Sequence, residues 1–143
     1  MTTKGGVEPQ LIGAWLTCRS LARGLPLPVP EFDGFRVDTD SETEIARWVF
    51  PKMGPGLQAL GRSIVEPRFF LKLCAPAREL RAALPLVWQL HPLGYFMRST
   101  GRAAEAQLPD GYRIETDRTG MVSAARIWAR TGELAASGYA AEA

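Results

Sequence analysis

The sequence predicts an α+β fold, in which a mixed or antiparallel sheet is flanked by helices. Three observations support this prediction. Apolar residues near the N-terminus recur with the period of a helix, residues 69–74 (FFLKLC) form a buried-strand pattern, and the last third consists of short strand-like runs separated by turns. With 143 residues, 46% of them hydrophobic, the chain suits one domain or two small lobes around a real core.

Residues 1–30 are expected to form an N-terminal helix and a proline-rich connector. Gly24, followed by Pro26, predicts the end of the helix. The run LPLPVP, residues 25–30, has proline at every second position and predicts an extended segment. We expect the helix to pack as an arm on the rest of the chain. Its apolar stripe consists of Leu11, Ile12, Trp15, Leu16 and Ala22.

Residues 31–107 predict an α+β lobe that begins with a strand and a helix. Residues 34–38 (GFRVD) alternate like a short strand. Ser41 and Glu44 have the spacing of a capping box, which predicts a helix that continues through Val49.

Four further elements and a turn are predicted in this lobe. Residues 99–107 are small and polar, which favours a linker that Leu108 and Pro109 close. The elements are a helix with Leu57, Leu60 and Ile64 on one face, the strand 69–74, a helix over residues 77–84, and two strands, 87–90 and 95–98, around a turn that contains His91.

Residues 108–143 predict a β-meander with strands over 112–116, 122–129 and 134–140. The last strand would leave an unpaired edge, which proteins usually cover. We therefore expect either dimerisation or cover by the N-terminal helix. Leu134, Ala136 and Tyr139 are the interface candidates.

An eight-residue motif occurs twice. DGFRVDTD at residues 33–40 is followed by DGYRIETD at residues 110–117, with only conservative differences. One interpretation is that both copies are the same kind of strand-entry turn, because turn chemistry is widely reused. The other is a duplication of two lobes that each begin at this motif. The sequence leaves both open.

Composition and charge argue against several function classes. The net charge of +2, with scattered arginines, does not indicate a nucleic-acid partner. The longest uncharged run, residues 82–97, contains prolines and polar residues and does not predict a membrane helix. No signal peptide is visible, so a soluble cytoplasmic protein is expected. Cys18 and Cys74 are expected to be free thiols, and no metal-ligand spacing is present.

Catalytic signatures are also missing from the sequence. It contains no GxSxG, HExxH, P-loop or dinucleotide-binding motif. His91 lies in a turn framed by proline and glycine, where a structural role needs neither a partner group nor a cleft. No catalytic residue and no metal site are therefore predicted.

Several stretches resemble a known family. They are RSLARGLP at residues 19–26, RVDT at 36–39, FLKLC at 70–74 and the run LPDGYRIETDRTGMVSAARIWARTGELAASGYAAEA at 108–143. Together they resemble bacterial GNAT-family N-acetyltransferases in which an N-terminal lobe precedes the acetyltransferase core. The resemblance implies a GNAT-like fold with an incomplete core, because residues 108–143 correspond to the opening strands of that core.

The resemblance also implies acetyl-CoA as the cofactor. In the family, its pyrophosphate is held by backbone N–H groups of an [RQ]xxGx[GA] loop at the start of a helix that follows the meander. No such loop follows the meander in this chain. The pattern does occur at residues 98–103, so Arg98, Gly101 and Ala103 are candidate cofactor-binding residues, although the required helix is not predicted after them.

Two functions follow as expectations. The first is an acetyltransferase-like protein that is catalytically incompetent as this chain and would need a complementing C-terminal GNAT half. The alternative is a non-catalytic α+β binding or regulatory module that acts as a homodimer.

Overall fold

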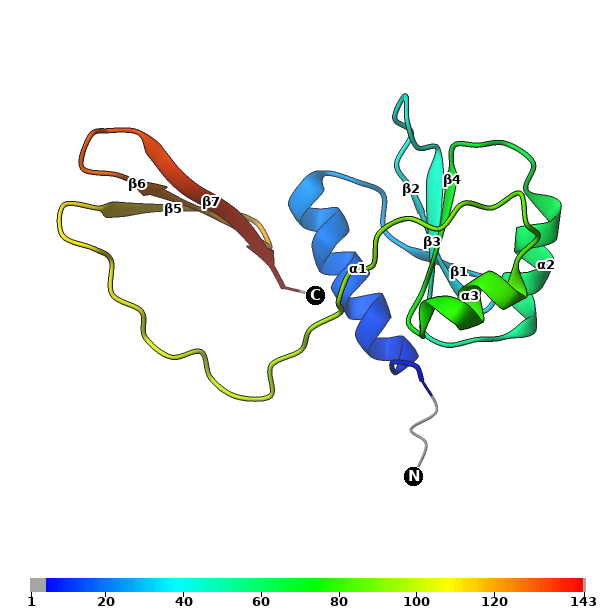
Figure 1. The fold of residues 1–143 in the computed structure, drawn as a ribbon. Coiled ribbons are helices and arrows are strands. Elements are labelled where there is room, and N and C mark those ends of the chain that lie inside the picture. Colours follow the sequence, from blue (N-terminus) through cyan, green and yellow to red (C-terminus); the bar gives the residue numbers. More distant parts are fainter. Residues whose placement is uncertain (1–4, 143) are drawn as a thin grey trace.

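The computed structural model describes residues 5–142, and within them it contains three helices and two sheets, which confirms the α+β class (Figure 1). Residues 1–4 and 143 of the predicted first and last segments lie outside the described residues. The elements are α1 (Pro9–Arg23), β1 (Val29–Glu31), β2 (Gly34–Asp38), β3 (Ala46–Phe50), α2 (Pro55–Ser63), β4 (Phe69–Leu73), α3 (Ala77–Ala83), β5 (Arg113–Thr119), β6 (Val122–Trp128) and β7 (Leu134–Ala141).

The first sheet has the strand order β1-β2-β3-β4. Strands β1, β2 and β3 pair antiparallel, whereas β3 and β4 run parallel, with Trp48 opposite Leu71. A parallel pair needs a crossover connection, and α2 supplies it. Strand β4 is consequently an edge strand of this sheet, and one side of its backbone pairs with no strand among the described residues.

Strand β3 supplies side chains to two separate hydrophobic cores. Because alternate residues of a strand face opposite sides, Trp48 and Phe50 pack against Leu57 of α2. Val49 points the other way and packs with a buried cluster that includes Ile12 of α1. Figure 1 shows α1 on one side of the sheet and α2 with α3 on the other.

Helix α1 ends where its sequence predicts. Pro9 occupies the first helical position, where a missing N–H does no harm. Gly24 ends the helix in the left-handed conformation with φ of 65°. The Leu25 N–H then donates to the Ser20 carbonyl at 2.9 Å, which satisfies a free carbonyl of the last turn.

The predicted helix at residues 41–49 is wrong, and the chain there forms a turn and then β3. The capping interaction itself exists, since the Glu44 N–H donates to Ser41 Oγ at 3.0 Å. No helix follows, however, because residues 46–50 pair with β2 on one side and β4 on the other. Pairing in the sheet buries both faces of the strand 46–50, and this burial outweighs a local signal for the start of a helix.

The two strands predicted at residues 87–90 and 95–98 are also wrong. Residues 84–112 contain neither helix nor strand. Pro85 and Pro92 have no backbone N–H to donate to a neighbouring strand. Among the described residues, residues 84–112 pair with neither of the two sheets. The predicted helices over 57–64 and 77–84 are confirmed within a few residues by α2 and α3.

The predicted β-meander is confirmed as the antiparallel sheet β5-β6-β7. This sheet is poorly covered, because every residue of β5 and nearly every residue of β7 is exposed. Helix α1 contacts β6 and β7, and Figure 1 shows the C-terminal end of β7 nearest to it.

The two copies of the repeated motif share one arrangement, in which the arginine lies over a tryptophan of the neighbouring strand. Arg36 of β2 lies opposite Trp48 with its guanidinium 5.0 Å from the ring centroid, and Arg113 of β5 lies opposite Trp128 at 5.4 Å. The likeness covers one hairpin only. After β3 the chain crosses over to the parallel strand β4, whereas after β6 it turns directly into the antiparallel strand β7.

The turn between β1 and β2 holds the start of α2. Asp33 Oδ2 accepts the Gly56 N–H at 2.9 Å, which satisfies a free donor at the helix N-terminus. The approach is so close that a Cβ atom on Gly56 would lie 2.0 Å from the Phe32 carbonyl oxygen.

We therefore predict that Gly56→Ala destabilises the fold by about 1–3 kcal/mol, because the new methyl group must displace backbone. Chemical denaturation would measure the change in the free energy of unfolding. Gly94→Ala is the matched control, since no atom lies within 4 Å of its Cβ position. Equal stability of the two variants would contradict this packing of the turn against α2.

Candidate functional site

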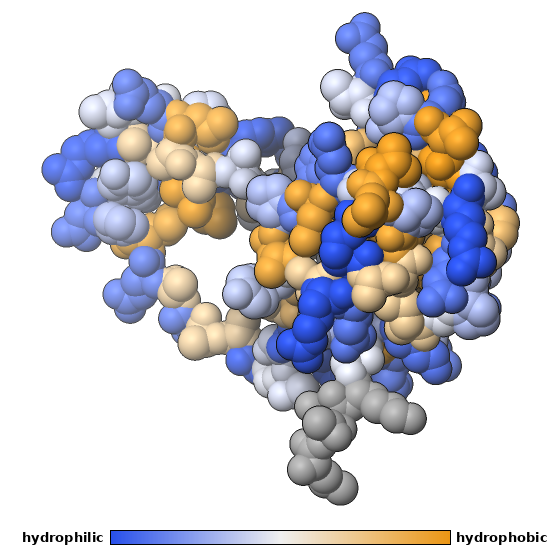
Figure 2. Space-filling model, turned by 45° about the vertical axis from the view of Figure 1, so that its right-hand side comes forward, coloured by the Kyte–Doolittle hydropathy of each residue, from blue (hydrophilic) through white to orange (hydrophobic). Residues whose placement is uncertain are grey.

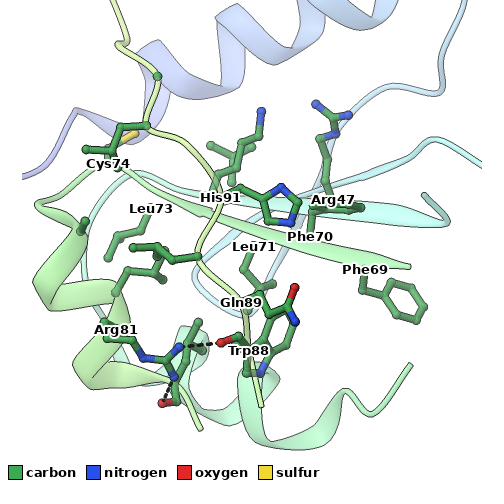
Figure 3. A pocket seen from close by; sticks show the side chains of 18 of the residues that line it. Arg47, Phe69, Phe70, Leu71, Leu73, Cys74, Arg81, Trp88, Gln89 and His91 are labelled. Carbon is green, nitrogen blue, oxygen red and sulfur yellow. Dashed lines mark hydrogen bonds between the residues drawn. The ribbon is translucent and has the colours of Figure 1, made fainter. Parts of the chain in front are cut away.

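An open groove of about 1250 Å³ follows the free edge of β4. One wall is β4 itself and the other is the irregular segment 87–96, and α3 and part of α1 contribute at the ends. Figure 3 shows labelled lining residues from both sides of the strand. A concave site of this size, lined by apolar and aromatic side chains with a few charged ones, makes the groove a candidate for a ligand site.

The segment 87–96 reaches both faces of the first sheet. On the face of α2, the Trp88 indole N–H donates to the Gly61 carbonyl at 2.8 Å. On the opposite face, His91 lies edge-on to Phe70 with ring centroids 5.6 Å apart. The segment therefore wraps around the edge of β4 and leaves the groove between itself and the strand.

Arg81 of α3 holds the beginning of this segment. Its guanidinium donates to the carbonyls of Leu84, Pro85 and Trp88 at 3.0, 2.5 and 2.6 Å. These bonds replace the pairing that a strand would have provided. Figure 3 shows Arg81 and Trp88 close together, at the beginning of the segment.

Much of the wall that this segment forms is apolar and exposed. Val87, Leu93 and Tyr95 line the groove and are all more than two-thirds exposed, with fractions from 71% to 91%. Figure 2 shows hydrophobic side chains exposed beside charged ones on the lobe. An apolar lining next to charged groups is typical of a site for an amphiphilic ligand.

Cationic side chains gather at one end of the groove. Arg47 of β3 and Lys72 of β4 line it. Arg19 and Arg23 of α1 are close enough to act on the charge of Lys72. Within residues 5–142 the single carboxylate that faces them all is Glu44, whose Oε2 accepts from Arg47 Nη2 at 2.7 Å. Four cations and one carboxylate leave a strong positive potential.

This concentration of charge shifts two pKa values. The pKa of Lys72 is lowered, first by loss of solvation and then by the positive charges of Arg47 and Arg19. The pKa of Arg19 is lowered for the same two reasons, with Arg47 again the largest charge. Both shifts mean that the cluster carries its charge at a cost in free energy.

A thiol and an imidazole of the groove, Cys74 and His91, are the side chains to consider for nucleophilic catalysis. Burial raises the pKa of the Cys74 thiol, which disfavours the reactive thiolate. His91 contacts the Phe70 ring, and within the described residues no carboxylate or hydroxyl hydrogen-bonds to it. The described part of the chain contains no group of three metal-ligating side chains.

The predicted cofactor residues Arg98, Gly101 and Ala103 lie outside the groove. All three are exposed in the irregular segment that leads to the meander. No helix begins after them, and the next regular element is β5. In this arrangement the backbone N–H groups of residues 98–103 do not form the anion-binding turn that the motif makes at a helix N-terminus.

The predicted interface residues lie on β7 but on two different faces. Ala136 shares one face with Ile114 and Ile127, which are its neighbours across the sheet. Leu134 and Tyr139, which are 50% and 69% exposed, point to the opposite face.

Comparison with known proteins gives no relative: no family model, curated protein or solved structure matches the chain. The residues themselves therefore carry the functional inference. Sequence reasoning missed the groove because Arg19, Arg47 and Lys72 are far apart in the chain and meet only through the sheet and the packing of α1. The usable signal was a charged residue within each of two strongly apolar strands, ARWVF and FFLKL.

We predict that Trp88→Phe loosens the segment 87–96, because it removes the hydrogen bond to Gly61 while keeping an aromatic ring. A loss of about 1 kcal/mol in unfolding free energy is expected. Limited proteolysis should cut the segment faster. Trp15→Phe is a control, since Trp15 is 38% exposed, meets the segment edge-on at Phe96 and keeps an aromatic ring in the variant. Unchanged proteolysis would show that the hydrogen bond does not hold the segment.

Proposed function

We propose that the chain is a GNAT-related binding module that lacks acetyltransferase activity by itself and works by association with a partner polypeptide. The observation that carries the proposal is the meander β5-β6-β7, a regular sheet with almost no core of its own. Small sheets are stable when one hydrophobic face is packed, so an uncovered sheet favours a partner.

One face of the meander suits such a partner. Ile114, Ile127 and Ala136 lie side by side across the three strands, followed by Thr116, Ala125 and Gly138. These side chains are small or apolar, and Ile114 is 53% exposed. The other face carries the ion pairs Arg113–Glu115 and Arg126–Asp117. The apolar face is therefore the docking surface of the proposal.

The family resemblance suggests what docks there. In a GNAT core the opening strands are followed by the strands and helix that bind acetyl-CoA, so a complementing C-terminal GNAT half would supply the pyrophosphate loop. The exposed placement of residues 98–103 supports the expectation that this chain alone does not hold the cofactor.

The isolated chain should show no acetyl-CoA binding in isothermal titration calorimetry with about 1 mM ligand. A dissociation constant of about 1 mM corresponds to a binding free energy of about −4 kcal/mol, so weaker binding than this is expected. Micromolar affinity would overturn the proposed incompetence. In that event Gly101→Asp should weaken binding and Arg102→Gln should not, if residues 98–103 form the site, because Gly101 is a defined position of the motif and Gln is itself allowed at its first position. Arg102 is the matched control because it lies within the same exposed segment but not at a defined position of the motif.

A homodimer is the second candidate, and the exposed edge of β7 favours it. Edge strands that are not covered tend to pair with another copy. Light scattering across a concentration series would detect the dimer. Ala136→Lys should weaken it about tenfold or more because it places a charge on the apolar face, whereas Ser137→Lys on the opposite face should have little effect. A monodisperse monomer at every concentration would contradict the homodimer.

Across residues 5–142, no helix combines the length and the apolar character that a bilayer crossing requires. The cytoplasmic location expected from the sequence stays a prediction.

A further inference from the structure

We propose that the groove between β4 and the segment 87–96 binds a small phosphomonoester with an apolar body, with the phosphate at Arg47 and Lys72 and the body along Phe70 and His91. This site lies on the first sheet, whereas the proposed docking surface lies on the meander. It would operate whether or not the chain associates with a partner.

Unused donors at the cationic end of the groove carry the first part of the argument. Arg47 donates from Nε and Nη2 to the same oxygen of Glu44, at 2.9 and 2.7 Å. Its Nη1 has no hydrogen-bond partner within residues 5–142 and is not buried. The ammonium of Lys72 likewise makes no hydrogen bond or ion pair to the described residues, so these donors are available to a ligand.

The charge of the cluster favours a doubly charged group. Arg19 and Arg23 approach from α1 and add to the positive potential without a carboxylate partner among the described residues. A single carboxylate would leave two of the three excess charges unbalanced. A phosphomonoester carries close to two negative charges at neutral pH and offers three acceptor oxygens. Arginine forks bind phosphate oxygens with well-matched geometry.

The walls of the groove indicate that the part of the ligand beside the phosphate is apolar. The lowered pKa of Lys72 and Arg19 shows that this end is partly shielded from water, which strengthens an ion pair with a bound anion. Beyond the charges, the Phe70 and His91 rings meet edge-on and present an aromatic surface, and Figure 3 shows Arg47, Phe70 and His91 close together on one side of β4. An aromatic or aliphatic body next to the phosphate would cover this surface.

The size of the groove agrees with an organic ligand rather than a lone ion. Its volume of about 1250 Å³ slightly exceeds the range of about 300–1,000 Å³ that is usual for small-molecule sites. An inorganic phosphate ion would leave most of the apolar lining in contact with water.

Isothermal titration calorimetry of the full chain at constant ionic strength tests the proposal with naphthyl phosphate as the probe. Inorganic phosphate is the control for the head group and naphthol the control for the body. Naphthyl phosphate should bind at least about tenfold more tightly than either control, because both parts of the site are then used. Equal affinity for naphthyl and inorganic phosphate, or for naphthyl phosphate and naphthol, would overturn it.

Variants locate the binding site. Lys72→Met should weaken naphthyl phosphate binding about five- to tenfold by removing a charge that lines the groove. Arg19→Gln should weaken it by a similar factor, because it removes a positive charge that acts at Lys72. Arg102→Gln, in the exposed linker, is the matched control and should bind like the wild type. Equal binding by all three variants would place the ligand elsewhere and refute the site.

Thermal unfolding provides a second readout that does not depend on measured affinity. The lowered pKa of Lys72 means that its charged form destabilises the folded state. This destabilisation is complete at a pH below the lowered pKa, and it is lost as the pH rises through the ordinary pKa near 10.5. Lys72→Met should therefore raise the melting temperature at pH 7 without ligand. At one ligand concentration, naphthyl phosphate should raise the melting temperature more for the wild type than for the variant, because the variant binds it more weakly. Equal shifts would contradict the site.

Two other classes of ligand are distinguished by the same assay. Neutral and phosphatidate-containing vesicles, added in place of naphthyl phosphate, test whether the phosphate belongs to a lipid surface. An acidic peptide tests for a protein partner. If the peptide competes with naphthyl phosphate and binds more tightly, the small-molecule proposal is wrong. If only the phosphatidate vesicles compete, the phosphomonoester site stands and its natural source is a lipid head group.

Discussion

Strand β3 is the element on which the rest of the lobe depends. Its five residues pair with β2 on one side and β4 on the other, and its two faces lie in two hydrophobic cores. Phe50 is fully buried against α2, and Val49 is buried against α1. Burial of a side chain of this size stabilises the fold by roughly 1.5–3 kcal/mol. Helices α1 and α2 thus pack on opposite faces of the sheet because alternate side chains of β3 point to opposite faces.

The groove is a consequence of the same arrangement. The crossover through α2 places β4 at the edge of the sheet, and no later strand pairs with it. The following segment instead crosses this edge, held by Arg81 and Trp88. The alternation that directs Val49 toward α1 directs Arg47 to the same face, where it meets Lys72 and the arginines of α1. Such uncompensated charge reduces stability, and functional sites are where proteins tolerate that cost.

The two hairpins with the repeated motif show how context changes the role of one local pattern. In the first, Trp48 is 3% exposed, its indole N–H donates to Glu31 at 2.7 Å, and helices cover both faces of the sheet. In the second, Trp128 is only partly buried and its indole nitrogen has no partner within the described residues. The same arginine contact orders both strands, yet only the first hairpin lies within a core. The second has apolar surface left for association.

The sequence by itself determined the elements whose signals are local. Gly24 and the apolar period predicted α1, the prolines before and after α2 and α3 set their limits, and the glycine turns predicted β6 and β7. The tertiary structure decided what depends on partners distant in the chain. Residues 46–50 became a strand because β2 and β4 pair with them, and residues 87–98 lost their predicted strands because no neighbour was available. Of the candidate site, the sequence showed only the charged residues within two apolar strands. Their meeting with Arg19 required the packing of α1, since the electrostatic potential of a groove depends on distances in space and not along the chain.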